Sequence, residues 1–245
     1  MKLSHMEIPT RFVDKAKFVL GVFTDVEMEY DFLLRLMTLT FDVVWRRRLL
    51  AKVEAAGGTA VLDLACGTGL VTFAVARRVG REGTVVGLDL SPAMLKAARK
   101  NKSTSSNGCT IEFVRAVAES LPFREGLFDY VTVGLALRNF ANKTAVFTES
   151  LRVLGRSGWF LSVDFVKPMR SYVWFIYRFH IFFVLPSLGR LVSKHWQWTL
   201  IYLADSIQIA TQPGELCTLL LDVGFRRTFL EKMSLGIVAL IGARK

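Results

Sequence analysis

Residues 61–69 read VLDLACGTG, a short apolar run followed by two closely spaced glycines. The run at 61–64, interrupted only by Asp63, predicts a buried parallel strand. Gly67 and Gly69 predict a tight turn, because glycine takes positive φ and lets the backbone approach a ligand closely. A helical pattern follows over residues 70–79. The turn should therefore present backbone N–H groups at a helix N-terminus, where polar and anionic groups bind.

A second acid, Asp89, ends the next apolar run, twenty residues after Gly69. An acid there can accept hydrogen bonds from both hydroxyls of a cofactor ribose. S-adenosylmethionine and a nicotinamide dinucleotide could both use this geometry. The dinucleotide fingerprint needs a third small residue where this chain has Thr72, so S-adenosylmethionine is favoured. A plain strand–turn–helix without a ligand is the remaining interpretation.

The composition limits the partners that the protein can have. It has 245 residues, a net charge of +11 and a sequence pI near 9.9. That charge favours an anionic partner, which could be a nucleic acid, a membrane surface or an acidic substrate. Apolar residues make up 52% of the chain and the mean hydropathy is +0.37. Together these values favour a membrane surface.

The cysteines and the first residues bear on the compartment. Cys66, Cys109 and Cys217 lack the spacing of a metal site, so we expect inert thiols in a reducing compartment and no metal. Residues 1–20 lack the continuous apolar core of a secretory signal. We therefore expect a cytoplasmic protein that is peripherally associated with the membrane.

Periodicity predicts a single domain, residues 1–245, with an α/β core. Residues 9–56 have a helical pattern and form an N-terminal lobe. Regular alternation of strands and helices follows, which predicts a parallel sheet covered by helices on both faces. In this core, residues 59–168, we expect strands at about 60–65, 84–89, 111–115, 128–134 and 158–164, and helices at about 70–79, 92–101 and 143–153.

The pattern changes after Pro168. Residues 169–209 form an apolar helical insertion, and residues 213–245 contain a last helix and two strands, 225–231 and 235–243, that predict a terminal hairpin. Within the insertion, residues 171–191 are almost continuously apolar, but Arg178, His180 and Pro186 argue against a membrane span. A lid over an apolar substrate, an interfacial helix and a core helix remain open. The exposed apolar surface is expected from Trp174, Phe175, Tyr177, Phe179, Phe182 and Phe183.

Several motifs resemble those of a known family. The loop DLACGTG, residues 63–69, resembles motif I of the class I methyltransferases, which bind S-adenosylmethionine. LRNF, residues 137–140, resembles the Gly-x-Arg-Asn signature of the UbiE/MenG quinone C-methyltransferases. The resemblance covers about residues 15–245 and implies a Rossmann-like sheet of seven strands, six parallel and the last antiparallel. It continues in Tyr30-Asp31, Trp45-Arg46, AESLPF at 118–123, VDFVKP at 163–168 and YLADS at 202–206.

The resemblance implies methyl transfer to a ring carbon of a polyprenyl hydroquinone, as in menaquinone or ubiquinone synthesis, with S-adenosylhomocysteine as the other product. Val117 stands where the family often has Asn or Asp, so backbone groups or Ala118 would hold the adenine. Leu34 and Leu200 also depart from the family pattern and leave the quinone open. The expected cofactor residues are Asp63, Gly67, Thr68, Gly69, Asp89, Leu90, Val117, Ala118 and Gly134.

Two neighbouring residues are candidates for the chemistry. Arg138 is a fixed cation suited to stabilising a phenolate oxygen; a structural ion pair with Asp129 or Asp164 is the alternative. Asn139 could orient the ring hydroxyl. His180 is a candidate base on the substrate side, or a residue of an aromatic layer. The expected substrate residues are Tyr30, Asp31, Arg138, His180 and Tyr202.

Other functions compete with quinone methylation. One is methyl transfer to another lipid or isoprenoid, and another is a nucleic-acid binder or RNA methyltransferase. Aromatic residues lie in apolar runs here and do not alternate with Lys and Arg as a base-stacking groove requires. We therefore expect no nucleic-acid partner. The expected partners are a lipophilic quinol and an anionic membrane surface, with a homodimer as a candidate assembly.

Overall fold

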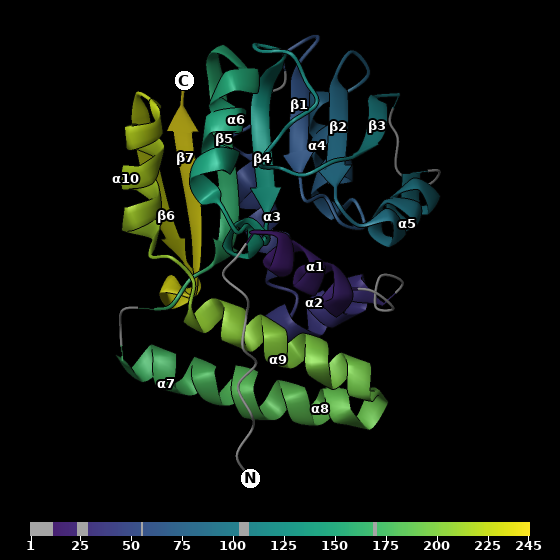
Figure 1. Ribbon diagram of the computed structural model, residues 1–245, viewed down its shortest axis with the longest axis vertical. Coiled ribbons are helices and arrows are strands. Elements are labelled where there is room, and N and C mark those ends of the chain that lie inside the picture. The colour runs from purple at the N-terminus through teal and green to yellow at the C-terminus, as the bar shows by residue number, and fades with distance from the viewer. Residues whose placement is uncertain (1–11, 24–28, 55, 103–107, 169–170) are drawn as a thin grey trace.

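A computed structural model describes residues 12–23, 29–54, 56–102, 108–168 and 171–245. Seven strands form one sheet in the order β3-β2-β1-β4-β5-β7-β6 (Figure 1). All neighbouring pairs are parallel except those of β7, which runs antiparallel to both β5 and β6. The strands are β1 Ala60–Leu64, β2 Thr84–Asp89, β3 Thr110–Arg115, β4 Phe128–Gly134, β5 Leu154–Phe165, β6 Arg227–Met233 and β7 Val238–Arg244.

The predicted fold class is confirmed, but β5, β6 and β7 begin at other residues than predicted. β5 begins at Leu154 rather than near residue 158, because Leu154 pairs with Phe128 before a register shift brings Trp159 opposite Tyr130. Such a bulge hides a strand from period-two pattern reading. The hairpin strands begin two and three residues later than predicted, because the 3₁₀ turn η3, Ser234–Gly236, separates them.

Helices cover both faces of the sheet, as the alternation of side chains along β1 requires. Val61 packs with α3 (Asp42–Leu50) and α4 (Leu70–Val79). Leu62, on the opposite face, belongs to the second core cluster, to which α6 (Lys143–Val153) and α10 (Pro213–Val223) also contribute. The remaining core helix, α5 (Pro92–Lys102), lies against β2 and β3.

The helix ends follow ordinary capping rules. The Asn142 side chain accepts a hydrogen bond from the Ala145 N–H at 3.0 Å and starts α6. Ser91 starts α5 in the same way, with its hydroxyl 3.2 Å from the Met94 nitrogen. Gly224 ends α10 at φ 119°, a left-handed conformation that glycine adopts without strain.

A second group of helices lies below the carboxyl ends of the strands (Figure 1). Two come from the N-terminal region, α1 (Phe12–Phe23) and α2 (Tyr30–Thr38). The others come from the insertion after β5: α7 (Ser171–Phe179), a π-helical turn η2 (His180–Val184), α8 (Leu185–Val192) and α9 (Lys194–Gln208). This layer closes the end of the sheet where ligands bind in open α/β folds.

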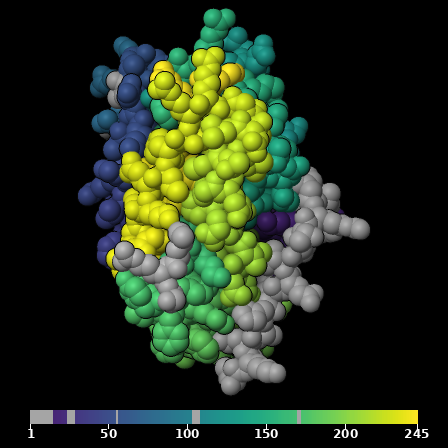
Figure 2. Space-filling view, turned by 90° about the vertical axis from the view of Figure 1, so that its left-hand side faces the viewer, coloured from purple at the N-terminus to yellow at the C-terminus, as the bar shows by residue number. Residues whose placement is uncertain are grey.

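The segment α7–η2–α8 is apolar on both its faces. Its inner face packs into the core through Val173, Ile181 and Leu185. Its outer face is open, with Phe175 74% exposed and Leu191 83% exposed. The green residues of α7 lie at the foot of the molecule in Figure 2, below α10. We call this outer face the apolar face; it comprises Tyr172, Phe175, Ile176, Phe179, Phe183, Leu188, Leu191 and Val192.

One part of the expected surface was wrong. Phe182 is buried and belongs to the core, while Trp174 and Tyr177 are half-buried. The π-helical turn shifts the helical phase at this point, so a regular period does not predict which way Phe182 points. Among the described residues, Tyr172–Val192 is the one helix with the length and composition to cross a membrane, a test that core helices of soluble proteins also pass.

Candidate active site

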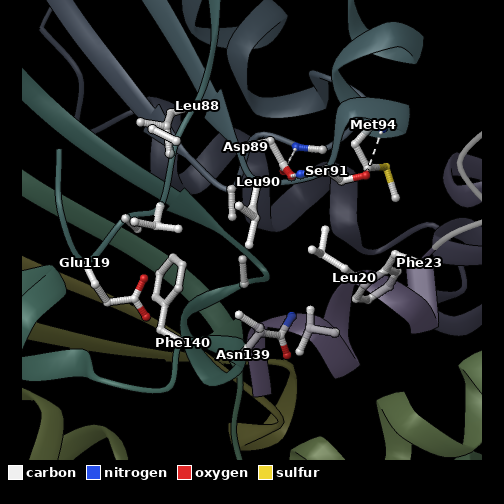
Figure 3. Close-up of a pocket in the computed structure, with 18 of the residues that line it drawn as sticks. Leu20, Phe23, Leu88, Asp89, Leu90, Ser91, Met94, Glu119, Asn139 and Phe140 are labelled. Atoms are coloured by element: carbon white, nitrogen blue, oxygen red, sulfur yellow. Dashed lines mark hydrogen bonds between the residues drawn. The ribbon is translucent and has the colours of Figure 1, made fainter. Parts of the chain in front are cut away.

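Two neighbouring cavities open at the carboxyl ends of β1, β2 and β4, on either side of the glycine loop. In the first cavity, Asp89 and Leu90 lie opposite Asn139 and Phe140 (Figure 3). Leu20 and Phe23 of α1 close a third side. Most of the wall is therefore apolar, with a few polar groups at defined places, as is usual for a small-molecule site.

Asp89 connects the first cavity to the glycine loop. Its Oδ2 accepts a hydrogen bond from the Gly67 N–H at 2.8 Å, and its Oδ1 accepts one from the Ser91 N–H at 2.8 Å. Burial raises the pKa of this carboxyl, and these backbone donors oppose the rise. Gly69 takes φ 90°, and a Cβ atom there would lie 2.5 Å from the Phe73 ring. The loop thus needs glycine at this position for both conformation and space.

Asp63 lies in a different environment from Asp89. It is almost fully buried, and its two oxygens accept hydrogen bonds from the hydroxyls of Thr72 (2.6 Å) and Thr132 (2.9 Å). Burial raises its pKa to about 6, opposed by the two threonines. Asp63 thereby joins α4 to β1 and β4 beneath the loop, and it borders the second cavity.

The other expected cofactor residues divide between the two cavities. Leu90, Val117 and Ala118 line the first cavity, Thr68 lines the second, and Gly134 borders both. Gly69 lines neither. The sequence motifs did not predict that α1 and Met94 line the first cavity. For α1, the amphipathic pattern of residues 12–23 was the one available signal in the sequence. The α1 residues of this wall are Ala16, Val19, Leu20 and Phe23.

Two expected substrate residues, Tyr30 and Tyr202, and the catalytic candidate Asn139 meet at the first cavity. Tyr30 and Asn139 line it, and the Tyr202 hydroxyl donates to Asn139 Oδ1 at 2.8 Å. Burial raises the pKa of Tyr30 to about 12, partly offset by the nearby Arg138. Tyr30 is therefore a protonated donor at neutral pH.

Two other expected substrate residues lie further away. Asp31 accepts a hydrogen bond from the Thr68 hydroxyl at 2.6 Å, which ties α2 to the glycine loop. His180 belongs to the π-helical turn and lines neither cavity. Burial lowers the pKa of His180. This location favours the aromatic-layer interpretation of His180 over its use as a base.

Arg138 lines neither of these two cavities. It is buried, forms an ion pair with Asp164 of β5 and donates to the Leu135 carbonyl (2.6 Å) and the Ser206 hydroxyl (3.0 Å). Burial is the largest influence and would lower the pKa of Arg138, but Asp164, Tyr202 and Tyr30 together raise the pKa overall. The structural ion pair, an alternative at the sequence level, is therefore present. Arg138 is placed to position the loop after β4.

The first cavity fits a nucleoside with an acid for its ribose. Asp89 supplies charged acceptors at one edge, and Leu90, Val117 and Ala118 supply apolar walls suited to a purine. Gly67, which has no side chain, brings the backbone close to the ligand beside Asp89. These residues fit S-adenosylmethionine as a cofactor.

Solved structures with this fold define the class. A methyltransferase from Thermotoga maritima, described as S-adenosylmethionine-dependent and a possible histamine N-methyltransferase, matches with a TM-score of 0.62 at 16% identity, covering 92% of this chain and 99% of that one. An S-adenosylmethionine-dependent methyltransferase from Aquifex aeolicus matches with a TM-score of 0.58 at 16% identity, covering 81% and 88%. The sheet and its loops are therefore those of the S-adenosylmethionine-dependent methyltransferase fold.

The family follows from the sequence. The model of the ubiE/COQ5 methyltransferase family matches residues 11–245, and the chain belongs to this family. Relatives named ubiquinone/menaquinone biosynthesis C-methyltransferase UbiE include one from Shewanella pealeana, 36% identical over 226 residues (92% of this chain, 90% of the relative). Another, from Marinomonas, is 35% identical over 234 residues (96% and 92%). The protein is thus a methyltransferase that uses S-adenosylmethionine.

Proposed function

We propose that the protein methylates a ring carbon of a polyprenyl hydroquinone, with S-adenosylmethionine as the methyl donor. The observation that carries the proposal is the first cavity, where Asp89 at one side faces Asn139 at the other across apolar walls. The names of the 35–36% identical relatives support this acceptor class. Methylation of another lipid or isoprenoid is the alternative, because the apolar wall suits those acceptors as well.

The residues around Asn139 suit an aromatic acceptor with hydroxyl groups. When bound, S-adenosylmethionine supplies an electrophilic methyl group. A ring carbon becomes a better nucleophile when a neighbouring hydroxyl carries negative charge. The Tyr202 hydroxyl donates its hydrogen bond to Asn139 Oδ1. The amide N–H groups of Asn139 therefore remain as donors for the negatively charged oxygen of the acceptor ring. Tyr30 offers a second donor.

Arg138 contributes through position and charge. It stays cationic behind the loop and holds the Leu135 carbonyl, so Asn139 keeps its direction. Fixing an acceptor against a donor can lower a barrier by about 7–11 kcal/mol. Val19, Leu20 and Phe140 supply apolar contacts for the ring and the start of its tail.

We also propose that the apolar face rests on an anionic membrane, from which the quinol enters. No acidic residue occurs in residues 165–204, while Arg178, Arg190 and Lys194 are exposed beside this face. Each such cation contributes about 1 kcal/mol to binding near an anionic surface. Burial of the aromatic side chains adds a contribution that salt does not screen. An anionic membrane would match both the exposed apolar side chains and the cations beside them. A second copy of this chain would instead bring like charges together.

The reaction is tested by mass spectrometry of quinones in a host that lacks its own quinone methyltransferase. Expression of the wild type should convert the demethylated quinone to the methylated one, and Asp89→Ala should not. If the quinones stay unmethylated while the purified protein binds S-adenosylhomocysteine, the acceptor is a different lipid.

The membrane contact is tested by flotation with anionic and with neutral liposomes. Phe175→Ser/Phe179→Ser should reduce flotation of the folded protein with both lipids, and salt should weaken but not abolish wild-type binding to anionic liposomes. Leu221→Ser, at an exposed apolar position on α10, is the control and should float like the wild type. Failure of the wild type to float with either lipid would refute the contact.

A further inference from the structure

The second cavity lies beyond the glycine loop from the first and has no role so far. The two cavities share five lining residues: Tyr30, Ala65, Gly67, Gly134 and Leu135. They therefore adjoin each other, and a ligand longer than a nucleoside can extend from one into the other. The second cavity is distinguished by the two charged residues that α3 contributes to its wall, Asp42 and Arg46.

Asp42 and Arg46 form a largely buried ion pair one helical turn apart. Asp42 has a fully buried side chain, and its Oδ1 accepts a hydrogen bond from the Thr38 hydroxyl at 2.9 Å. Arg46 Nη1 lies 2.5 Å from Asp42 Oδ2, and the Arg46 side chain is 14% exposed. Among described residues, this pair is the one polar contact of the Arg46 guanidinium, which has five N–H donors. A largely buried cation with unused donors at a cavity wall favours an anionic ligand group.

The surroundings of Arg46 hold its helix in place. The neighbouring Trp45 donates from Nε1 to the Ser234 hydroxyl at 2.9 Å and packs edge-on against Phe165. These contacts fix the rotation of α3, so Arg46 faces the cavity while the adjacent Arg47 is exposed to solvent. Such support is what a binding site needs to keep a charged group in position.

The charges in this cavity complement an α-amino acid. The carboxylate of such a ligand needs a cation, which Arg46 supplies. Its ammonium group needs acidic or carbonyl oxygens, and Asp63 and the backbone of the glycine loop supply these at the cavity wall. We infer that Arg46 binds the α-carboxylate in the methionine half of S-adenosylmethionine, with Asp42 as its positioning partner. This inference rests on the proposed use of that cofactor. Arg46 then fixes the amino-acid end while Asp89 holds the ribose.

Two ligands separate this role from a structural one. S-adenosylhomocysteine carries the amino-acid half, and 5′-methylthioadenosine lacks it. By calorimetry, Arg46→Gln should weaken S-adenosylhomocysteine binding at least about tenfold, as expected for loss of a charge-assisted contact. Its affinity for 5′-methylthioadenosine should stay within about twofold of wild type, which also shows that the variant is folded.

Two further variants complete the experiment. Arg47→Gln, which removes the neighbouring exposed cation, should bind both ligands like the wild type. Arg46→Lys keeps the charge without the planar fork and should lose less affinity for S-adenosylhomocysteine than Arg46→Gln.

The outcomes separate this inference from the proposed function. Equal losses for both ligands, or no loss for either, would overturn the role of Arg46 and leave it as the partner of Asp42. If the wild type itself binds neither ligand, the cofactor assignment of the proposed function fails first.

Discussion

The loops after β1 and β4 begin alike but are held in place differently. Each starts with a residue other than glycine at positive φ, Ala65 at 51° and Leu135 at 57°. The conformation of the first loop is set by nearby backbone. Its glycines turn the chain, and Asp89, at the end of the adjacent strand, accepts a hydrogen bond from the Gly67 N–H. The second depends on Arg138 and its distant partners. Both loops line the cavities, but long-range contacts of a buried cation hold the second loop, whereas backbone conformation and one strand-end acid shape the first.

The buried ion pair should give the largest effect. Arg138→Met leaves the Asp164 carboxylate buried without a cation, so the free energy of unfolding should fall by about 3–5 kcal/mol. Urea denaturation measures this change. Arg48→Met, which breaks the exposed pair with Glu231, is the control and should cost less than about 1 kcal/mol. Similar losses in both variants would contradict the contrast between the loops.

The first loop should respond through ligand affinity. Asp89→Ala removes a charged acceptor for two ribose hydroxyls, each bond worth roughly 1.5–3 kcal/mol. Calorimetry with S-adenosylhomocysteine should show at least a tenfold loss of affinity. Asp222→Ala, at an exposed position on α10, should leave the affinity unchanged. Unaltered binding in Asp89→Ala would refute the ribose assignment.

Asp63, beneath the first loop, should make stability depend on pH. Its folded pKa of about 6 lies above the ordinary value of 3.8, so the folded state holds the proton more tightly. Unfolding free energy should therefore fall as pH rises from about 4 to 7, by about 3 kcal/mol relative to Asp63→Asn. Urea denaturation of both proteins across this range measures the difference. A constant difference between them would show that Asp63 titrates normally.

The smallest effect should come from the hydrogen bond that orients Asn139. Tyr202→Phe removes a donor worth about 0.5–1.5 kcal/mol. We expect kcat to fall by about two- to tenfold while affinity for S-adenosylhomocysteine stays within about twofold. Tyr172→Phe, at an exposed tyrosine of α7, serves as the control. A loss confined to cofactor affinity would mean that Asn139 serves the cofactor instead.

The first loop could be predicted from the sequence because its determinants are local. Gly67, Gly69 and Asp89 act through backbone conformation and a fixed position at a strand end, both of which spacing reveals. The same reasoning predicted the alternation of strands and helices. The antiparallel direction of β7 followed from family resemblance and not from periodicity.

The second loop and the helical layer could not be predicted to the same depth. Whether Arg138 points into the cavity or toward Asp164 depends on Ser206 and β5, which are distant in the sequence. The direction of Phe182 depends on a π-helical turn. The amphipathic pattern of α1 predicts a helix with one buried face. It does not predict against which part of the molecule that face packs, so the place of α1 in the cavity wall could not be predicted.

The place of β7 in the sheet has a consequence for synthesis of the chain. β7, residues 238–244, lies between β5 and β6 and pairs with both. Until those residues leave the ribosome, β5 keeps one open edge and β6 has no partner in the sheet. Open strand edges promote aggregation during folding. The emerging chain should therefore need protection by chaperones until residue 244 has been released. Strands β1 to β4, which carry the first cavity, can assemble earlier.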